Sequence, residues 1–322
     1  MMKKNSSISE RASVGATFAL DTELFSLSPA LPFPIYLQSA QGLIRWRDAG
    51  QLHQLAVQTI EPYRHTLRVK VEDAETYAFF LDGKLRSLSR GSAEQDELFV
   101  RIATLLGQAI ERALHHSPWS IALYGLAKRW ANVLADHLAQ GDVSPALDRH
   151  VVQGLGPSHA IRTALMVGWY EVTQSAHRQR CEAMMLAALC HDIGHVLYPT
   201  HSDTQIAAAD PHHDHPHLSI KLLASAGPIP PLTFNAILGH HERPDGRGYP
   251  HGIHGRDLGY GARLLGCANL LDHALIHGGG AADWHAAVGR VTALGDGAYD
   301  PQILSGFVGC ERRHKDSEDL SG

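Results

Sequence analysis

The chain has 322 residues, which at roughly 150 residues per domain is enough for about two domains. Its formal charge of −5 argues against a protein that grips the nucleic-acid backbone, because such proteins carry a basic surface. Hydrophobic residues make up 44% of the chain, a share that supplies a sizeable core and excludes global disorder.

The apolar runs and the cysteines predict the cellular setting. The longest purely apolar run, Ala183 to Cys190, is far shorter than the roughly 20 residues of a membrane span. No apolar stretch near the N-terminus has the length of a signal peptide. The 4 cysteines lie far apart without a C-x-x-C pair, so they predict neither a disulfide framework nor a thiolate zinc site. We therefore expect a cytoplasmic protein without membrane contact.

The first part of the chain predicts a tail followed by a small α/β domain. Residues 1–30 are rich in serine and lack periodicity, which is typical of a mobile tail. Within 31–91, apolar runs predict strands at Phe33 to Leu37 and at Leu67 to Val71. Between them, Gln51 to Tyr63 has the pattern of a helix.

Residues 92–145 predict a helical connector. Ser92 with Gln95 three residues later forms a capping-box pattern, and apolar residues then recur at helical spacing. Pro118 ends this helix, and a second runs from Trp119 to Leu138. Apolar stripes of this kind more often form a core or a dimer seam than a ligand site. A homodimer through helices 93–140 is therefore one expectation.

The next segment is predicted to be helical and is dense in histidine. Of the 23 histidines, 14 lie between His150 and His254. Neutral imidazole is the commonest metal ligand in proteins. The charged residues that end the chain, by contrast, predict a polar C-terminal tail over 291–322.

Four histidine groups follow one another in this segment, at His159, His191-Asp192, His215 and His240-His241. Several imidazoles with one carboxylate suit Fe, Mn, Zn or Ni better than Ca or Mg. The two oxygens of a carboxylate can bridge two metals. Two metals roughly 3.5–4 Å apart polarise a phosphoryl group and hold a hydroxide for in-line attack. The pattern therefore favours phosphoester hydrolysis.

Each group also has a simpler interpretation. A lone buried His159 is more often a hydrogen-bonded core residue, and His-Asp pairs such as His191-Asp192 are common by chance. The tract from His212 to His217 could be a surface loop, and His240-His241 could be polar loop sequence. The shared order and spacing of the four groups favours the metal site.

The segment resembles an HD-GYP domain, a subgroup of the HD phosphohydrolase superfamily. The family blocks are H-S-x-R-V, H-D-I-G-K, H-P-x-x-G-x-x-L-L, H-H-E-x-x-D-G-x-G-Y-P and A-R-I-x-x-x-A-D-x-x-D-A-L. Here they read His159-Ala-Ile-Arg162, His191-Asp192-Ile193-Gly194-His195, His215 to Leu223, His240 to Pro250 and Ala262 to Asp272. The block HHERPDGRGYP is highly specific. The 31–91 module also resembles a small α/β domain that often precedes HD-GYP domains.

The resemblance implies a mainly α fold, in which an all-helical HD-type domain over 146–290 follows the small α/β N-terminal domain and the connecting helices. It implies metal-dependent hydrolysis of the bacterial second messenger cyclic di-GMP, to the linear dinucleotide or GMP, by a dinuclear centre with a bridging hydroxide. The cofactors would be two divalent transition-metal ions, Fe or Mn in first place and Zn or Ni as alternatives. By position, the first metal falls to His159, His191, Asp192 and Asn269, and the second to Asp192, His215, His240 and His241.

The resemblance also assigns residues to catalysis and to substrate. Asp192 and His195 are the candidate catalytic residues. Tyr249 and Pro250 would shape the loop over the substrate groove, and this loop could also dock a protein partner. The guanidinium of Arg263 suits a phosphate contact, because it offers paired donors. The candidate substrate-binding residues are Arg243, Asp245, Gly246, Gly248, Tyr249, Pro250 and Arg263.

Three positions depart from the family pattern. Asn269 stands where the family has an aspartate, so the first metal loses a negative ligand. His195 replaces the lysine of H-D-I-G-K, and Leu155 lies where some members carry a glutamate for a third metal. Leu155 argues against a third metal. Asn269 and His195 keep an alternative open, in which a weakly active or inactive module binds cyclic di-GMP or a protein partner as a receptor. A general nucleotide phosphohydrolase is a third possibility, against which the GYP block argues.

Overall fold

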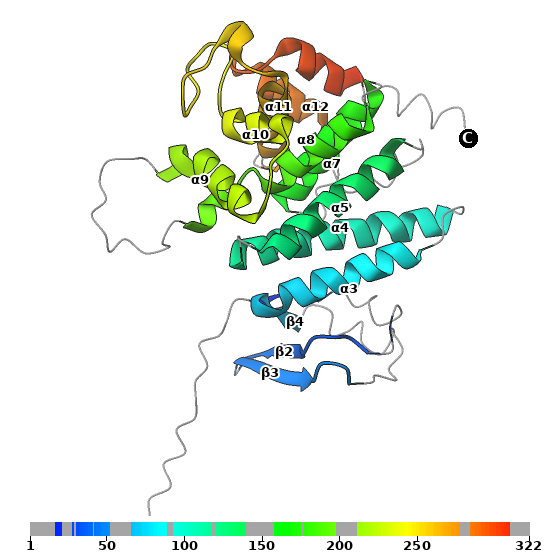
Figure 1. The fold of residues 1–322 in the computed structure, drawn as a ribbon. Helices are drawn as coiled ribbons and strands as arrows, with labels where there is room; N and C mark the ends of the chain where they lie inside the picture. Colours follow the sequence, from blue (N-terminus) through cyan, green and yellow to red (C-terminus); the bar gives the residue numbers. More distant parts are fainter. Residues whose placement is uncertain are drawn as a thin grey trace, which may run out of the picture. The chain divides into compact units, whose positions relative to one another are not determined.

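A computed structural model describes residues 17–20, 28, 30–40, 42–51, 66–88, 93–117, 120–139, 158–174, 177–197, 211–276 and 284–309. The chain divides into two compact units, Met1–Phe80 and Leu81–Gly322. The fold is mainly helical with a small N-terminal sheet (Figure 1), as the sequence predicts. The helix expected between Gln51 and Tyr63 and the capping box at Ser92 lie outside the described residues.

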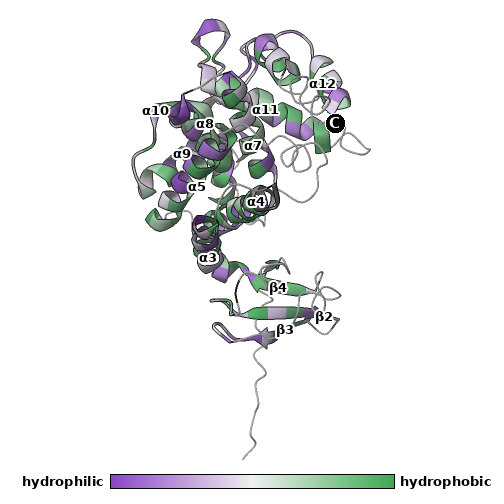
Figure 2. Cartoon of the chain, turned by 90° about the vertical axis from the view of Figure 1, so that its right-hand side faces the viewer, coloured by the Kyte–Doolittle hydropathy of each residue, from purple (hydrophilic) through white to green (hydrophobic). Residues whose placement is uncertain are grey.

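The first unit is built on a four-stranded antiparallel sheet in the order β1-β4-β2-β3. Its strands are β1 (Thr17–Ala19), β2 (Ile35–Ser39), β3 (Gly42–Arg47) and β4 (Leu67–Lys70). Strand β2 begins with hydrophobic residues and ends with hydrophilic ones (Figure 2). Leu67 and Val69, two residues apart on β4, are fully buried. Phe33 packs edge-on against Tyr77 at 5.1 Å between ring centroids.

The two predicted strands are confirmed, β2 with a shift of two residues, but two further strands were not predicted. Strand β1 lies inside the segment for which the sequence predicts a tail. Phe18 on this strand pairs with Val69 and is buried, so the predicted tail over 1–30 is wrong at this point. Three residues are too few to reveal the alternation that identifies a strand.

Helices make up the second unit, and Figure 1 shows α7 and α8 lying side by side. Helix α3 follows β4 through a short 3-10 turn and crosses the boundary between the units. The helices are α3 (Ala74–Ser87), α4 (Ala93–His116), α5 (Ile121–Ala139), α7 (His159–Thr173), α8 (Arg178–Cys190), α9 (Pro211–Ala226), α10 (Pro231–Gly239), α11 (Tyr260–Ile276) and α12 (Trp284–Thr292), with 3-10 turns η2 (Val71–Asp73), η3 (Ile193–Leu197) and η4 (Gly255–Asp257).

The two predicted connector helices correspond to α4 and α5, and their apolar stripes are buried in the second unit. The indole N–H of Trp130 on α5 donates to the carbonyl of Ala103 on α4 at 2.7 Å. A Cβ on Gly107 of α4 would lie 2.4 Å from Cδ1 of Ile161 on α7, so this glycine permits close helix packing. These stripes therefore form part of the core that supports α7 and α8.

The C-terminal segment differs from the predicted polar tail. Residues 301–309 form a further helical segment, and Phe307 within it is fully buried. Its ring lies 4.8 Å from that of Tyr170 on α7. The prediction of a tail from residue 291 is therefore wrong as far as residue 309. The polar stretch between α12 and this segment is a turn that precedes one more packed helix.

Within the part of the chain that the structure describes, no helix combines the length and the apolarity needed to cross a membrane.

Candidate metal centre

The centre begins at the C-terminal end of α8. The apolar run Ala183 to Cys190 lies on this helix and is buried from Met184 to Cys190, where the helix ends. His191 follows as the C-cap, and its Nδ1 lies 2.7 Å from the carbonyl oxygen of Ala188. The last carbonyls of a helix lack intrahelical partners, so this imidazole N–H satisfies one of them. With Nδ1 facing the helix end, Nε2 of His191 faces His159.

The same local device recurs at α10. This helix ends at Gly239, His240 is its C-cap, and Nδ1 of His240 lies 2.6 Å from the carbonyl oxygen of Ile237. Both histidines thus carry their proton on Nδ1 in the tautomer that these contacts favour. Both rings are then left with an unprotonated Nε2.

Ser219 and Gly194 fix the turn after α8 against α9, which carries His215. The Ser219 hydroxyl donates to the His191 carbonyl at 2.6 Å and accepts the Gly194 N–H at 2.8 Å. A Cβ on Gly194 would lie 2.2 Å from the carbonyl oxygen of His215. Only glycine allows this approach, so the G of the H-D-I-G block positions His215 beside Asp192.

His159, His191 and Asp192 form a first group of potential metal ligands. The Nε2 atoms of His159 and His191 lie 3.1 Å apart. Asp192 turns Oδ2 toward them, at 3.3 Å from Nε2 of His191 and 3.8 Å from Nε2 of His159.

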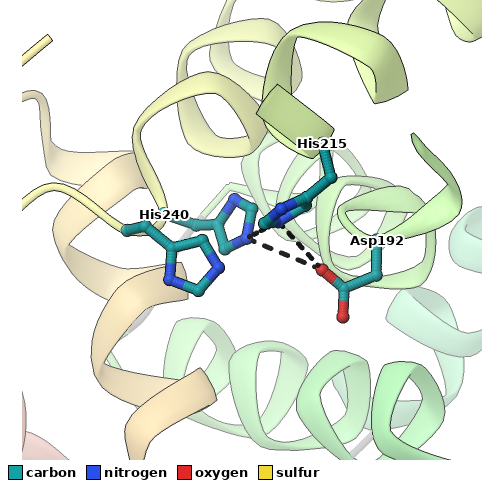
Figure 3. A group of neighbouring side chains, drawn as sticks. Asp192, His215 and His240 are labelled. Carbon is teal, nitrogen blue, oxygen red and sulfur yellow. Dashed lines mark hydrogen bonds and ion pairs between the residues drawn. The ribbon is translucent and has the colours of Figure 1, made fainter. Parts of the chain in front are cut away.

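His215, His240 and His241 form a second group around the other oxygen of Asp192. Figure 3 shows Asp192, His215 and His240 converging; Oδ1 lies 3.3 Å from Nε2 of His215 and 3.7 Å from Nε2 of His240. The two Nε2 atoms lie 3.1 Å apart. One carboxylate therefore faces both groups, one oxygen to each.

These residues fit the divalent transition metals expected from the sequence. In the tautomers described above, His191 and His240 each present an unprotonated Nε2 to the centre, and such nitrogens suit a transition-metal cation. Asn269 on α11 adds a further donor: its Oδ1 is buried and has no hydrogen-bond partner among the described residues. An unpaired buried oxygen is costly unless something binds it.

The protonation states of His191, His241 and Asp192 favour metal binding as well. Burial above all lowers the pKa of His191 to about 3. Burial and the neighbouring histidines also lower the pKa of His241 strongly. Burial alone would raise the pKa of Asp192, but His191, His215 and His240 hold it well below its usual range. Neutral imidazoles and a charged carboxylate are the forms that bind metals.

Asp272, which ends the last of the five sequence blocks but was assigned no role, holds His159 in place. Its Oδ2 lies 2.6 Å from Nδ1 of His159, and Arg162 donates to the same carboxylate at 2.6 and 2.8 Å. Burial opposes both charges, yet this contact raises the pKa of His159 and keeps that of Asp272 low. The spacing in the sequence could have revealed this role, because Asp272 follows Asn269 by three residues and so lies on the same face of α11.

A pocket of about 260 Å³ opens beside the second group. His240, His241 and Asn269 line it, together with the predicted substrate residues Arg243, Gly248, Tyr249 and Arg263 and with residues that were not predicted, among them Arg247, Tyr299 and Asp300.

The segment after α10, in which the GYP block lies, folds back onto the metal-ligand groups. The buried Glu242 accepts the N–H groups of His251 and Ile253 at 2.6 and 2.9 Å. A Cβ on Gly248 would lie 2.4 Å from Cα of Glu242, so a side chain there would push the loop outward. Tyr249 stacks on His241 at 4.5 Å between ring centroids.

The remaining predicted residues lie around this loop. Arg243 pairs with Asp245 at 2.7 Å, and Arg263 pairs with Asp300 at 2.5 Å. The ring of His195 stacks on His215 at 4.1 Å. Gly246 has a φ of 75°, which favours glycine, and Pro250 is half-buried after Tyr249. Leu155 lies outside the described residues.

Known proteins resemble this chain in sequence and in fold. A family model described as HD domain matches residues 143–303. Over 129 residues the chain is 30% identical to cyclic di-GMP phosphodiesterase PA4108 of Pseudomonas aeruginosa. That match covers 38% of the chain and only 31% of the relative.

Among solved structures, Bd1817, a HDG"Y"P protein of Bdellovibrio bacteriovorus, superimposes with a TM-score of 0.64. The superposition covers 91% of this chain and 97% of the other, at 14% identity. At this identity the likeness speaks for the fold, and it agrees with the predicted helical HD-type architecture.

Proposed function

The chain belongs to the HD domain family, and from that premise we propose that it is a metal-dependent phosphodiesterase that hydrolyses cyclic di-GMP. One observation carries the proposal: the two oxygens of Asp192 face two separate groups of histidines. The Pseudomonas relative named as a cyclic di-GMP phosphodiesterase supports the choice of substrate.

Each group of ligands would hold one divalent transition-metal ion, Fe or Mn in first place and Zn or Ni as alternatives. When bound, such ions polarise a phosphoryl group and activate water for attack on it. His159 and His191 would hold the first ion, with the Asn269 carbonyl completing the set. His215, His240 and His241 would hold the second. Asp192 would contact both ions and keep them close together.

The pocket beside these ligands would hold the substrate. Arg243, Arg247 and Arg263 line it, and guanidinium groups suit phosphate oxygens because they offer paired donors. Tyr249, stacked on His241, would limit how far the substrate can move from the metal ligands. His195, whose ring lies against His215, would stand near the scissile phosphate in place of the family lysine.

The test is turnover by protein of defined metal content. The chain is purified anaerobically, its metals are counted, and cyclic di-GMP cleavage is followed after adding Mn or Fe. We expect linear product only with metal, and a loss of roughly 100-fold or more in Asp192→Asn. Asp257→Asn, an exposed carboxylate on η4, is the matched control and should leave turnover unchanged. If metal-loaded protein gives no linear product, the proposal that the chain is a cyclic di-GMP phosphodiesterase is wrong.

Asn269 and His195 favour a second candidate function, a receptor that binds cyclic di-GMP without turnover. Turnover by the wild type separates the two, and the variant Asn269→Asp tests the role of Asn269, because a carboxylate there restores the missing negative charge. On the enzyme hypothesis, metal occupancy after dialysis and turnover both rise above those of the wild type. On the receptor hypothesis, the wild type binds cyclic di-GMP tightly and yields no linear product. If occupancy and turnover both stay unchanged in Asn269→Asp, Asn269 is not a metal ligand.

A further inference from the structure

Asp300 lies where the pocket meets the helical segment 301–309, and its two oxygens have different partners. Oδ1 accepts the backbone N–H groups of Gln302 at 2.9 Å and Ile303 at 3.3 Å, so it caps the start of that segment. Oδ2 accepts a hydrogen bond from Nη1 of Arg263 at 2.5 Å. Because Asp300 is nearly buried, little solvent competes for either contact.

The contact with Asp300 engages only one side of the Arg263 guanidinium. Arg263 lies on α11 and lines the pocket together with His240 and His241. Its Nε is buried and has no hydrogen-bond partner among the described residues, while 33% of the side-chain surface stays exposed. Asp300 therefore fixes the direction of the guanidinium through Nη1, and the exposed part of the side chain leaves the group open to an anion in the pocket.

The segment before Asp300, which includes Gly297, contacts the loop after α10. The Asp245 N–H donates to the Gly297 carbonyl at 3.0 Å, and Arg243 clasps the Asp245 carboxylate with two hydrogen bonds. A Cβ on Gly297 would lie 2.7 Å from Cβ of Asp245, so the two segments are in close contact. The segment that carries Asp300 is therefore held against the loop after α10 by the contacts of Gly297 with Asp245.

We propose that Asp300 is a positioning residue, which orients Arg263 toward a phosphate of the substrate before the substrate binds. The inference rests on the proposed function and adds a determinant of affinity that lies beyond the predicted domain limit at residue 290. A preoriented side chain loses less freedom when the substrate arrives. Removing the contact should therefore weaken binding and leave the chemical step largely intact.

Two substitutions separate positioning from helix capping. In Asp300→Ser, the hydroxyl still caps the segment but is too short to reach Arg263. In Asp300→Ala, both contacts are lost. We expect Asp300→Ser to have the unfolding temperature of the wild type. Its KM for cyclic di-GMP should rise roughly five- to tenfold, and its kcat should change less than about twofold. Asp300→Ala should show the same KM and a lower unfolding temperature.

The variant Arg263→Ala, alone and combined with Asp300→Ser, completes a double-mutant cycle. If Asp300 acts through Arg263, adding Asp300→Ser to Arg263→Ala raises KM no further. An unchanged KM in Asp300→Ser, with turnover retained by the wild type, overturns the role of Asp300 and leaves the proposed function standing. A lowered KM overturns it too, because Asp300 would then compete with the substrate. A metal-loaded wild type that neither binds nor cleaves cyclic di-GMP overturns the proposed function and this inference with it.

Discussion

Three histidines of the centre have the ring nitrogen that faces away from it engaged by another part of the protein. For His191 and His240 the partner is the carbonyl of the residue three positions earlier, at the end of the preceding helix. For His159 it is the Asp272 carboxylate. A fixed Nδ1 contact sets the tautomer and the direction of the ring, which raises the basicity of the nitrogen that faces a metal.

Asp272 gives a test of this ordering. Asp272→Asn keeps the side-chain shape but removes the charge that His159 and Arg162 share. We expect the affinity for the first metal to fall roughly 10- to 100-fold, as for other residues that support metal ligands. Calorimetric titration of metal-free protein with Mn measures this without reliance on activity. Asp257→Asn serves as the control, and equal affinities in the two variants would refute the role of Asp272.

At the scale of elements, the centre depends on how closely the turn η3 approaches α9. His215 comes from α9, and Asp192 precedes η3, so the distance between them depends on that contact. Gly194 makes the contact possible, because any side chain there meets the backbone of α9.

Gly194→Ala should therefore disturb both stability and the metal site. The added Cβ would meet the His215 carbonyl, and forced packing of this kind costs about 1–3 kcal/mol. We expect a lower free energy of unfolding in urea and weaker Mn binding. Gly289→Ala in α12 is the matched control, since a Cβ there meets nothing within 4 Å. If the two variants are equally stable and bind Mn equally, the contact does not constrain the site.

For the whole molecule, the centre acts as a junction of helices that are distant in the sequence. Its potential His and Asp ligands come from the start of α7, the residues directly after α8, the second turn of α9 and the residues directly after α10. Ions bound there would link these elements, and a ligand that binds only the folded state stabilises it.

Removal of metal should accordingly lower the unfolding temperature of the chain. Saturation at about 1,000 times Kd contributes roughly 4 kcal/mol to folding. We expect thermal unfolding to shift upward when Mn is added to chelator-treated protein and to shift back when chelator is restored. Asp192→Ala, which removes the shared ligand, should lose most of the shift. A shift of full size in that variant would place the stabilising ion elsewhere.

The sequence predicted what is local in the chain and missed what packing creates. The His191-Asp192 and His240-His241 groups are visible because each consists of neighbouring residues placed directly after a helix. The roles of Asp272 and Asp300 were missed because their partners, His159 and Arg263, lie 113 and 37 residues away. The burial of Phe307 was missed for another reason. The polar turn before residue 300 led to the prediction of a tail, although a helical segment follows it.

If both proposed metal sites fill, the shared carboxylate of Asp192 would make their loading a linked equilibrium. The ion that binds first would draw charge from a ligand that the second ion also needs, so the second would bind more weakly than it would alone. Because such coupling is reciprocal, neither site would have an affinity independent of its neighbour. Over an interval of metal concentration the protein would therefore be half-loaded, with one ion per chain.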